Sequence, residues 1–299
     1  MMKISIIIPS YNSRKTIWHT LKSLSTQTRP DLIEEIIVVD SSDDVATVKL
    51  LKEAAGKGEI KLIKPACKTM PAIARNIGAG HAAADYLAFL DSDVMAAGDW
   101  VEKVMMFFDK GYRAGGGSVS APFFQQSSRI ALAQLFLQFN EFLNFGVMRK
   151  KFFCPSCNLF CEKKLFDLVG GFPAIRASED VLFGLELTKH CALWFVPEVA
   201  VFHIFREEKS GFLNNQRLLG RYINIWRSRA ESRRFYYKRL WAILFMPAFF
   251  AVKFARILSR IVRTDIPTLS RFCYSMPFFL LGLFFWSLGF AKGGSDDEA

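Results

Sequence analysis

The segment Tyr86-Leu-Ala-Phe-Leu-Asp-Ser-Asp93 places two carboxylates directly after a short apolar run. Residues 86–90 have the length and the β-rich composition of a buried strand. Asp91 and Asp93 follow where that strand should end. In an open α/β sheet, ligands bind beyond the carboxyl ends of the strands. The segment therefore predicts a strand that delivers two carboxylates to a ligand site.

Three further apolar runs alternate with amphipathic segments along the first half of the chain. We expect strands at residues 4–8, 36–39 and 60–63, and helices at residues 17–24, 45–55 and 72–84. This alternation is typical of strand-helix-strand units and a parallel sheet. Polar clusters also follow the first two strands, at residues 9–12 and 40–44. We expect them to converge with Asp91 and Asp93 at one edge of the sheet.

Asp91 and Asp93 form an Asp-x-Asp pair that suits a divalent cation. Mg²⁺ and Mn²⁺ prefer hard oxygen ligands and keep part of their coordination shell for water and substrate phosphate. A solvated turn is the alternative interpretation of an isolated Asp-x-Asp pair. Its place after a buried strand favours a metal site.

The formal net charge of +11 is unevenly distributed. Residues 1–205 carry 23 Lys and Arg against 21 Asp and Glu, whereas residues 206–299 carry 16 against 7. We therefore expect a domain at residues 1–205 and a basic amphipathic segment at residues 206–239 that lies at a membrane interface. Nucleic acid is the alternative partner for these charges, but no recognised nucleic-acid module accompanies them.

Two apolar segments and a short acidic tail follow the basic stretch. Residues 272–291 contain no charge and are long enough to span a bilayer. Residues 240–258 contain Pro247, Lys253 and Arg256, which leaves both an interfacial and a spanning arrangement open. These segments make up a membrane-associated region at residues 240–292, and residues 293–299 form the tail.

A series of motifs resembles the family 2 glycosyltransferases, which share the GT-A nucleotide-sugar fold and invert configuration at the anomeric carbon. The resemblance covers roughly residues 3–205. The motifs, in the family's order, are Ile8-Pro-Ser-Tyr-Asn12, Val38-Val-Asp40, Ala74-Arg-Asn76 with Gly78, Phe89-Leu-Asp-Ser-Asp93, Gly170-Gly-Phe172, Glu179-Asp180, and Pro197 followed by His203. Each motif alone is weak evidence, but seven in order are specific.

The resemblance implies a role for each of these motifs in binding a nucleotide sugar. Pro9, Tyr11, Asn12, Asp40, Arg75 and Asp91 would bind the donor, and Asp91, Asp93 and His203 would hold Mg²⁺ or Mn²⁺. Asp180 would be the general base that takes the proton of the attacking hydroxyl, and Glu179 would position the acceptor or Asp180.

Two departures from the family pattern bear on function. Asp40-Ser41-Ser42 stands where family members commonly have Asp-Gly-Ser, so the backbone is less permissive there. The Gln-x-x-Arg-Trp motif of the processive synthases is not evident after Asp180. Its absence favours a transferase that adds one sugar over a polymerase.

Several of these residues also have purely structural interpretations. His203 follows an apolar run and could be a packed core histidine, and Arg75 could cap or pair with a helix. Cys154, Cys157 and Cys161 invite a zinc site, but no fourth ligand is apparent at a suitable spacing, and buried thiols are favoured. Residues 130–148 read as a buried helix, with contact to lipid or a lipid-linked acceptor as the second interpretation.

The sequence thus predicts a membrane-attached glycosyltransferase whose catalytic domain faces the cytoplasm at the inner membrane. Its donor is a nucleotide-diphosphate sugar, with a UDP-sugar favoured and GDP-mannose possible, and its acceptor is membrane-proximal and lipid-linked. No nucleic acid is expected. The alternative is a non-catalytic nucleotide-sugar-binding or scaffolding subunit, which would have no chemical need for Asp180.

Overall fold

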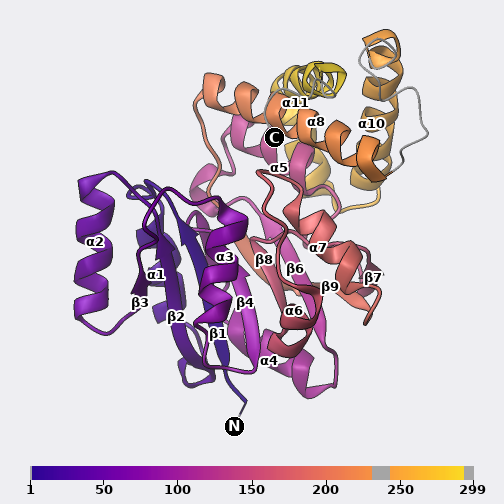
Figure 1. Cartoon of the computed structure of the whole chain (residues 1–299). Coiled ribbons are helices and arrows are strands. Elements are labelled where there is room, and N and C mark those ends of the chain that lie inside the picture. The colour runs from indigo at the N-terminus through magenta and orange to yellow at the C-terminus, as the bar shows by residue number, and fades with distance from the viewer. Residues whose placement is uncertain (1, 231–242, 293–299) are drawn as a thin grey trace. The chain divides into compact units, whose positions relative to one another are not determined.

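The computed structural model describes residues 2–230 and 243–292 (Figure 1). Two compact units are present: unit 1 contains the described parts of residues 1–120 and 142–204, and unit 2 those of residues 121–141 and 205–299. The structure thus groups residues 121–141 with the C-terminal segments, although they fall inside the domain predicted at residues 1–205. The end of the predicted basic segment and the predicted acidic tail lie outside the described residues.

Within the described residues, unit 1 is built on one nine-stranded mixed sheet of order β3-β2-β1-β4-β8-β6-β9-β5, and β7 pairs with β9. The strands are β1 (Ile4–Ser10), β2 (Ile33–Asp40), β3 (Lys61–Ile63), β4 (Tyr86–Leu90), β5 (Val94–Ala96), β6 (Ala114–Ser120), β7 (Arg149–Lys151), β8 (Asn158–Glu162) and β9 (Leu193–His203). β1, β2, β3 and β4 are parallel to one another, and β8 runs antiparallel to β4 and β6. All four predicted strands are confirmed.

The helices of unit 1 follow from local sequence signals. They are α1 (Ile17–Ser25), α2 (Val45–Gly56), α3 (Pro71–Gly80), α4 (Trp100–Asp109), α6 (Lys163–Val169) and α7 (Glu179–Leu187), with a 3₁₀ turn η1 (Pro30–Leu32). Asp44 caps α2 by accepting hydrogen bonds from the amides of Ala46 and Thr47. The helix predicted to continue to residue 84 ends at Gly80, because the chain must turn there to enter β4.

Two features bring α3 and α7 to the same edge of the sheet. A Cβ atom at Gly78 would lie 2.5 Å from a methyl carbon of Ile7, so only glycine lets α3 approach β1 this closely. The ring of Phe172 packs against Phe89 of β4 and Phe183 of α7, with ring centroids 5.1 and 4.5 Å apart. Aromatic packing therefore fixes α7 beside the end of β4.

Unit 2 is helical in its described residues. It contains η2 (Phe123–Gln125), α5 (Arg129–Phe139), α8 (Lys209–Ala230), α10 (Met246–Ile261) and α11 (Ile266–Lys292). The helix predicted at residues 130–148 was too long: it stops at Phe139, because Phe142 is buried in the core of unit 1 and the chain continues into β7. Within the described residues, α11 is the one helix long and apolar enough to cross a membrane.

Candidate active site

The carboxyl ends of β1, β2 and β4 lie at one edge of the sheet, because these strands are parallel and adjacent (Figure 1). Ser10 at the end of β1 pairs in register with Asp40 at the end of β2. Asp91 follows the last residue of β4. The predicted convergence of the polar clusters at this edge is confirmed.

Arg75 connects the end of β4 to the start of α7. Its Nη2 donates to Oδ1 of Asp91 at 2.5 Å, and its Nη1 donates to Oε1 of Glu179 at 3.0 Å. The residue is 2% exposed. Burial opposes the positive charge, but the two carboxylates outweigh that effect and raise the pKa of Arg75 above its ordinary value. Arg75 is therefore held as a permanent cation between two carboxylates.

Asp180 follows Glu179 in the first turn of α7, and its environment suits a general base. Loss of hydration, reinforced by the charge of Glu179, raises the pKa of Asp180 to about 7, while the amide of Val181 and the cation of Arg75 oppose the rise. Ser178, just before the helix, has a φ of 68°, a left-handed conformation rare outside glycine. The backbone at this turn is thus strained where it presents the two carboxylates.

Asp91, Asp93 and His203 form, within the described residues, the one group of three or more potential metal-binding side chains. β5 runs antiparallel to β9 with Val94 opposite His203, and this register places the neighbouring Asp93 beside the imidazole. Nε2 of His203 lies 3.6 Å from Oδ1 of Asp93. One ligand atom from each residue falls within 4.8 Å of the other two.

The donor set of this group fits a divalent cation such as Mg²⁺ or Mn²⁺. Two carboxylates supply hard oxygen ligands, and the imidazole adds a nitrogen that suits Mn²⁺ in particular. All three side chains are half-buried, so they are partly shielded and still reachable from solvent. Cys154, Cys157 and Cys161 are buried free thiols and are not members of this group. Burial raises the pKa of each of these thiols, which keeps them protonated and disfavours a zinc site there.

Asp40 is a fully buried carboxylate. One of its oxygens accepts hydrogen bonds from protein hydroxyls, and the other is available to a ligand. Its Oδ1 accepts hydrogen bonds from the hydroxyls of Ser10 at 2.9 Å and Ser42 at 2.5 Å. Its Oδ2 has no hydrogen-bond partner among the described residues, and Nζ of Lys64 lies 4.0 Å from it. A buried acceptor that lacks a donor is costly unless a ligand supplies one.

Tyr11 and Asn12 belong to the same end of the site. The Tyr11 hydroxyl donates to Asp43 at 3.1 Å, and the Asn12 side-chain amide donates to the other oxygen of Asp43 at 2.7 Å. Asn12 has a φ of 50°, which asparagine tolerates better than most residues. Pro9 is buried inside β1 opposite Val39, so the structure gives it a place in the strand and no exposed surface at the site.

Sequence reasoning missed two residues at this edge. Nζ of Lys68 lies 3.9 Å from the centroid of the Tyr11 ring and covers the face predicted to receive a nucleotide base. Asn76 exchanges two hydrogen bonds of 2.8 Å with the backbone of Phe172 and so fixes the Gly170-Gly-Phe172 turn. The Ala74-Arg-Asn76 motif offered a signal for the second residue, because Arg75 and Asn76 point to different parts of one site.

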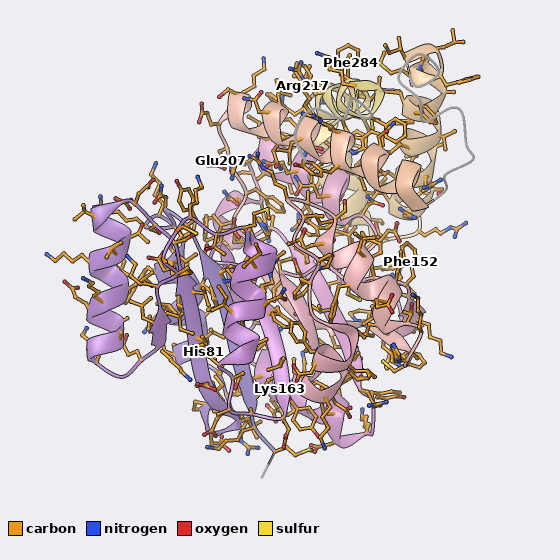
Figure 2. The ribbon with its side chains drawn as sticks, in the orientation of Figure 1. His81, Phe152, Lys163, Glu207, Arg217 and Phe284 are labelled. Carbon is orange, nitrogen blue, oxygen red and sulfur yellow. The ribbon has the colours of Figure 1, made fainter. Side chains whose placement is uncertain are left out.

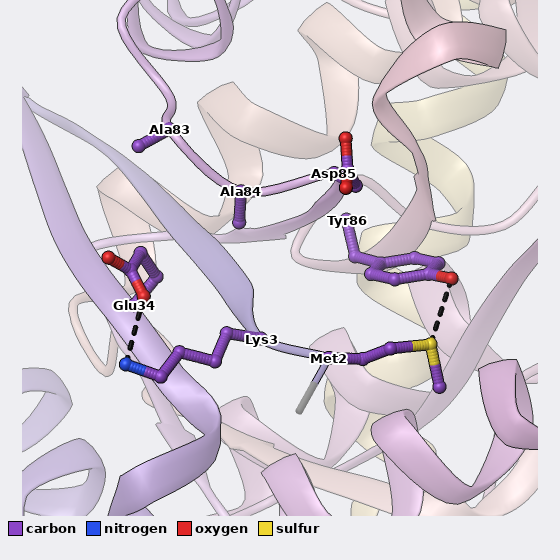
Figure 3. A pocket seen from close by; sticks show the side chains of 7 residues that line it. All are labelled: Met2, Lys3, Glu34, Ala83, Ala84, Asp85 and Tyr86. Atoms are coloured by element: carbon purple, nitrogen blue, oxygen red, sulfur yellow. Dashed lines mark hydrogen bonds and ion pairs between the residues drawn. The ribbon is translucent and has the colours of Figure 1, made fainter.

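A separate cavity of about 440 Å³ lies at the amino ends of the same strands (Figure 3). Its lining includes Lys3, which pairs with Glu34 at 3.0 Å, and Tyr86, whose hydroxyl lies 3.0 Å from the sulfur of Met2. It holds none of the predicted site residues. The predicted site residues therefore lie at the carboxyl edge and not at this cavity.

The fold and the site together are typical of nucleotide-sugar transferases. One family within that class matches the chain. Residues 5–177, more than half of the chain, match the model of glycosyl transferase family 2. The chain belongs to this family.

Two curated relatives illustrate the range of the match. The chain is 30% identical over 111 residues to the poly(ribitol-phosphate) beta-N-acetylglucosaminyltransferase TarS of Staphylococcus aureus, covering 37% of this chain and 19% of the relative. It is 26% identical over 172 residues to the glycosyltransferase AglE of Haloferax volcanii, covering 57% and 56%. The chain thus matches less than two thirds of the length of either relative.

Solved structures show the same fold. S. aureus TarS 1–349 in complex with UDP-GlcNAc matches with a TM-score of 0.56 at 16% identity, covering 93% of this chain and 90% of that chain. GalNAc-T7 with UDP, GalNAc and Mn²⁺ matches with a TM-score of 0.57 at 17% identity, covering 79% and 53%. At these identities the likeness establishes the fold alone.

Proposed function

We propose that this chain transfers a sugar from a UDP-sugar to a hydroxyl group of an acceptor, with inversion at the anomeric carbon. The observation that carries the proposal is Asp180, a carboxyl whose pKa is raised to about 7 beside the Arg75 network and the metal-binding group. A carboxyl that titrates near neutral pH is half ionised there and can accept a proton from an alcohol as its oxygen attacks.

The donor end of the site would be recognised by this chain's own side chains. The available oxygen of Asp40 would accept a hydrogen bond from a base N–H or a ribose hydroxyl. The Tyr11 ring would stack on the base once Lys68 moves aside, and the cation of Lys68 would then be near the donor phosphates. The similar TarS structures in complex with UDP and with UDP-GlcNAc favour a uridine donor over GDP-mannose.

The protein would supply a general base, a residue that positions the carboxylates, and a set of metal ligands. The acceptor C–O bond forms as the bond from the anomeric carbon to the diphosphate breaks, and the hydroxyl proton passes to Asp180. Arg75 would hold Asp91 and Glu179 in place and keep Glu179 from raising the pKa of Asp180 further. Asp91, Asp93 and His203 would hold a divalent cation, which supplies positive charge to the departing diphosphate when bound.

The acceptor is proposed to be membrane-proximal and lipid-linked, with the site on the cytoplasmic face of the inner membrane. Support comes from unit 2, which combines the long apolar helix α11 with a strong excess of basic residues. Nucleotide sugars are made in the cytosol, so the site must face that compartment.

The test is metal-dependent release of nucleoside diphosphate from a panel of nucleotide sugars, measured with and without a membrane lipid extract. The wild-type chain, Asp180→Asn and Asp109→Asn would be compared, the last being an exposed carboxylate at the end of α4. Release that Asp109→Asn retains and Asp180→Asn loses supports the proposal. Nucleotide binding without release in any chain would instead identify a non-catalytic subunit.

A further inference from the structure

The 20 uncharged residues at positions 272–291 lie in α11, and much of that helix is buried within unit 2. Its buried residues are Phe272, Ser275, Phe279, Gly282, Leu283, Trp286, Ser287, Gly289, Phe290 and Ala291. The Phe272 ring packs on Phe136 of α5 with centroids 5.2 Å apart. A Cβ atom at Gly282 would lie 2.6 Å from a methyl carbon of Leu137 in α5. The first half of α11 is thus covered by α5.

The second half of α11 is in backbone contact with α8. A Cβ atom at Gly220 of α8 would lie 2.0 Å from the carbonyl oxygen of Trp286, and one at Gly289 of α11 would lie 1.9 Å from the carbonyl oxygen of Arg217. Glycine on both helices lets the two backbones touch. Arg217 of α8 also lies over the Phe285 ring, 5.3 Å from its centroid, and Figure 2 labels Arg217 together with Phe284 of α11.

The polar composition of α8 is unsuited to a helix that packs against a membrane-spanning helix. It contains five cationic residues, Lys209, Arg217, Arg221, Arg227 and Arg229, and its Gln216 and Asn224 are fully buried. Charged side chains at membrane depth are costly. If α11 crossed a bilayer with its present neighbours, α8 would carry some of its cationic residues into the lipid.

α5 imposes the same restriction at the other end of α11. α5 is a short helix of unit 2. In the sequence it lies between residues 120 and 142, and both of these residues belong to unit 1. Its flanking residues are polar and bound to the C-terminal helices: Arg271 donates to Gln126 at 2.8 Å, and Arg260 pairs with Glu141 at 2.9 Å. A crossing α11 would have to take both ends of α5 with it.

We infer that unit 2 docks on one leaflet of an anionic bilayer and that α11 does not cross it. α11 is then the central helix of a membrane-surface platform, and the predicted span at residues 272–291 is covered by protein for much of its length. Docking on one leaflet is compatible with both the apolar composition of α11 and the polar character of α8.

The docking surface is formed by η2 and the start of α11. Phe123 is 88% exposed and Ile266 is 83% exposed. The two elements are neighbours, because the Tyr274 hydroxyl donates to the carbonyl of Ser127 at 3.2 Å and Arg129 lies over the Tyr274 ring at 4.5 Å.

The positive charge of unit 2 favours an anionic bilayer as the partner of this surface. Arg129, Arg263 and Arg271 are exposed and lie close in the sequence to Phe123 or Ile266. The described parts of unit 2 carry thirteen Lys and Arg against four Asp and Glu. Exposed apolar side chains together with exposed arginines match the interface of a bilayer with anionic headgroups.

The first experiment measures the side of the membrane on which each segment lies. Chains with Cys273→Ser and either Thr264→Cys or Ala299→Cys would be produced in cells, and sealed right-side-out and inverted vesicles would be treated with an impermeant maleimide. The exposed Cys67 of unit 1 serves as the internal reference. We expect positions 264 and 299 to be labelled only in the vesicles that label Cys67. Opposite labelling at 299 would demonstrate a single span, and opposite labelling at 264 a helical hairpin; either overturns the inference.

The second experiment measures binding of the purified full chain to vesicles of stated composition. We expect binding to phosphatidylglycerol-containing vesicles to exceed binding to pure phosphatidylcholine about tenfold or more, and to weaken with salt. Phe123→Ser and Arg263→Gln should each weaken it about threefold or more. Val45→Ser, an equally exposed apolar residue on α2 of unit 1, should leave it unchanged. Equal binding to both vesicles, or a dimer that Phe123→Ser dissociates, would contradict a lipid occupant.

Discussion

The buried Arg75 and the half-buried Asp91 form an ion pair in which Nη2 lies 2.5 Å from Oδ1. Asp91 also belongs to the metal-binding group, so a guanidinium and a divalent cation would share this carboxylate. Arg75 reaches Glu179 as well, at 3.0 Å, and Glu179 raises the pKa of Asp180. One side chain thus links the candidate metal-binding group to the proposed general base.

Replacing Arg75 with glutamine should shift the pH dependence of the reaction. The cation of Arg75 lowers the pKa of Asp180, and without it only the amide of Val181 opposes the effects of burial and of the charges of Glu179 and Asp91. The acidic limb of the kcat/KM profile should therefore move to higher pH, with a smaller shift for Arg75→Lys. Arg113→Gln, which removes an exposed pair with Glu162, is the matched control. An unchanged limb in Arg75→Gln would separate Arg75 from the base.

Asp180→Asn should lower kcat by about 10²–10⁴-fold while nucleotide binding persists, because the amide cannot accept the proton. In the wild-type chain, activity should rise with pH through about 7, where Asp180 loses its proton. Rate measurements from pH 5.5 to 8.5 and isothermal titration with UDP check both points. Activity of Asp180→Asn within twofold of wild type would assign the base elsewhere.

The stability of the same variant provides the control for folding. The pKa of Asp180 is raised in the folded state, so the unfolded chain loses this proton first as pH rises from about 4 to about 7, and the folded state is destabilised across that window. Asp180→Asn removes this penalty. Its Tm at pH 8 should equal or exceed that of the wild-type chain, so lost activity would reflect chemistry and not unfolding.

Asp93→Asn should weaken the metal dependence of the reaction. The substitution keeps the shape of the side chain but removes a negative charge from the group formed with Asp91 and His203. The Mn²⁺ concentration for half-maximal activity should rise about tenfold or more. Asp99→Asn, an exposed carboxylate paired with Lys103, should leave that concentration unchanged. Full activity in the presence of a chelator would argue against a metal.

Asp40→Asn should weaken nucleotide binding about 10–100-fold, because the buried acceptor proposed to contact the nucleoside is partly replaced by a donor. Ser10 and Ser42 hold the committed oxygen, so the side chain should keep its position. Isothermal titration with UDP and with GDP measures the loss. Asp31→Asn, an exposed carboxylate paired with Arg29, is the control that should bind like wild type.

Gly220→Ala and Gly289→Ala should destabilise unit 2, because each added methyl group would meet a backbone carbonyl at 2.0 or 1.9 Å. Overpacking of this kind costs about 1–3 kcal/mol. Gly211→Ala lies in the same helix as Gly220, with no atom closer than 3.9 Å, and should be neutral or stabilising. Thermal unfolding of the three chains makes the comparison. Equal Tm values would contradict the close contact of α8 and α11.

The carboxyl edge was predictable from sequence because local patterns determine it. A short β-rich run ending in Asp-Ser-Asp predicts both the strand β4 and the position of Asp91 at its end. His203 could be proposed only from its place in a series of motifs, since its contact with Asp93 depends on the register of β5 and β9. Long-range register is invisible to local periodicity.

Other features depend on tertiary packing and were missed for that reason. Residues 140–148 continue the apolar composition of α5, but Phe142 packs in the core of unit 1 and the helix stops before it. Lys68 covers Tyr11 across 57 residues of sequence, and no spacing rule predicts such a contact. The partner of α5 was equally hidden, because α11 lies at the far end of the chain.

The pairing of α5 with α11 has a consequence for biosynthesis. α5 leaves the ribosome more than a hundred residues before the helix that covers Phe136 and Leu137. During that interval its apolar face has no partner from α11, and a nascent chain in that state exposes a surface prone to aggregation or chaperone capture. Unit 2 can be completed only after the last helix is synthesised. A premature stop before residue 266 would therefore leave the apolar face of α5 without its partner α11.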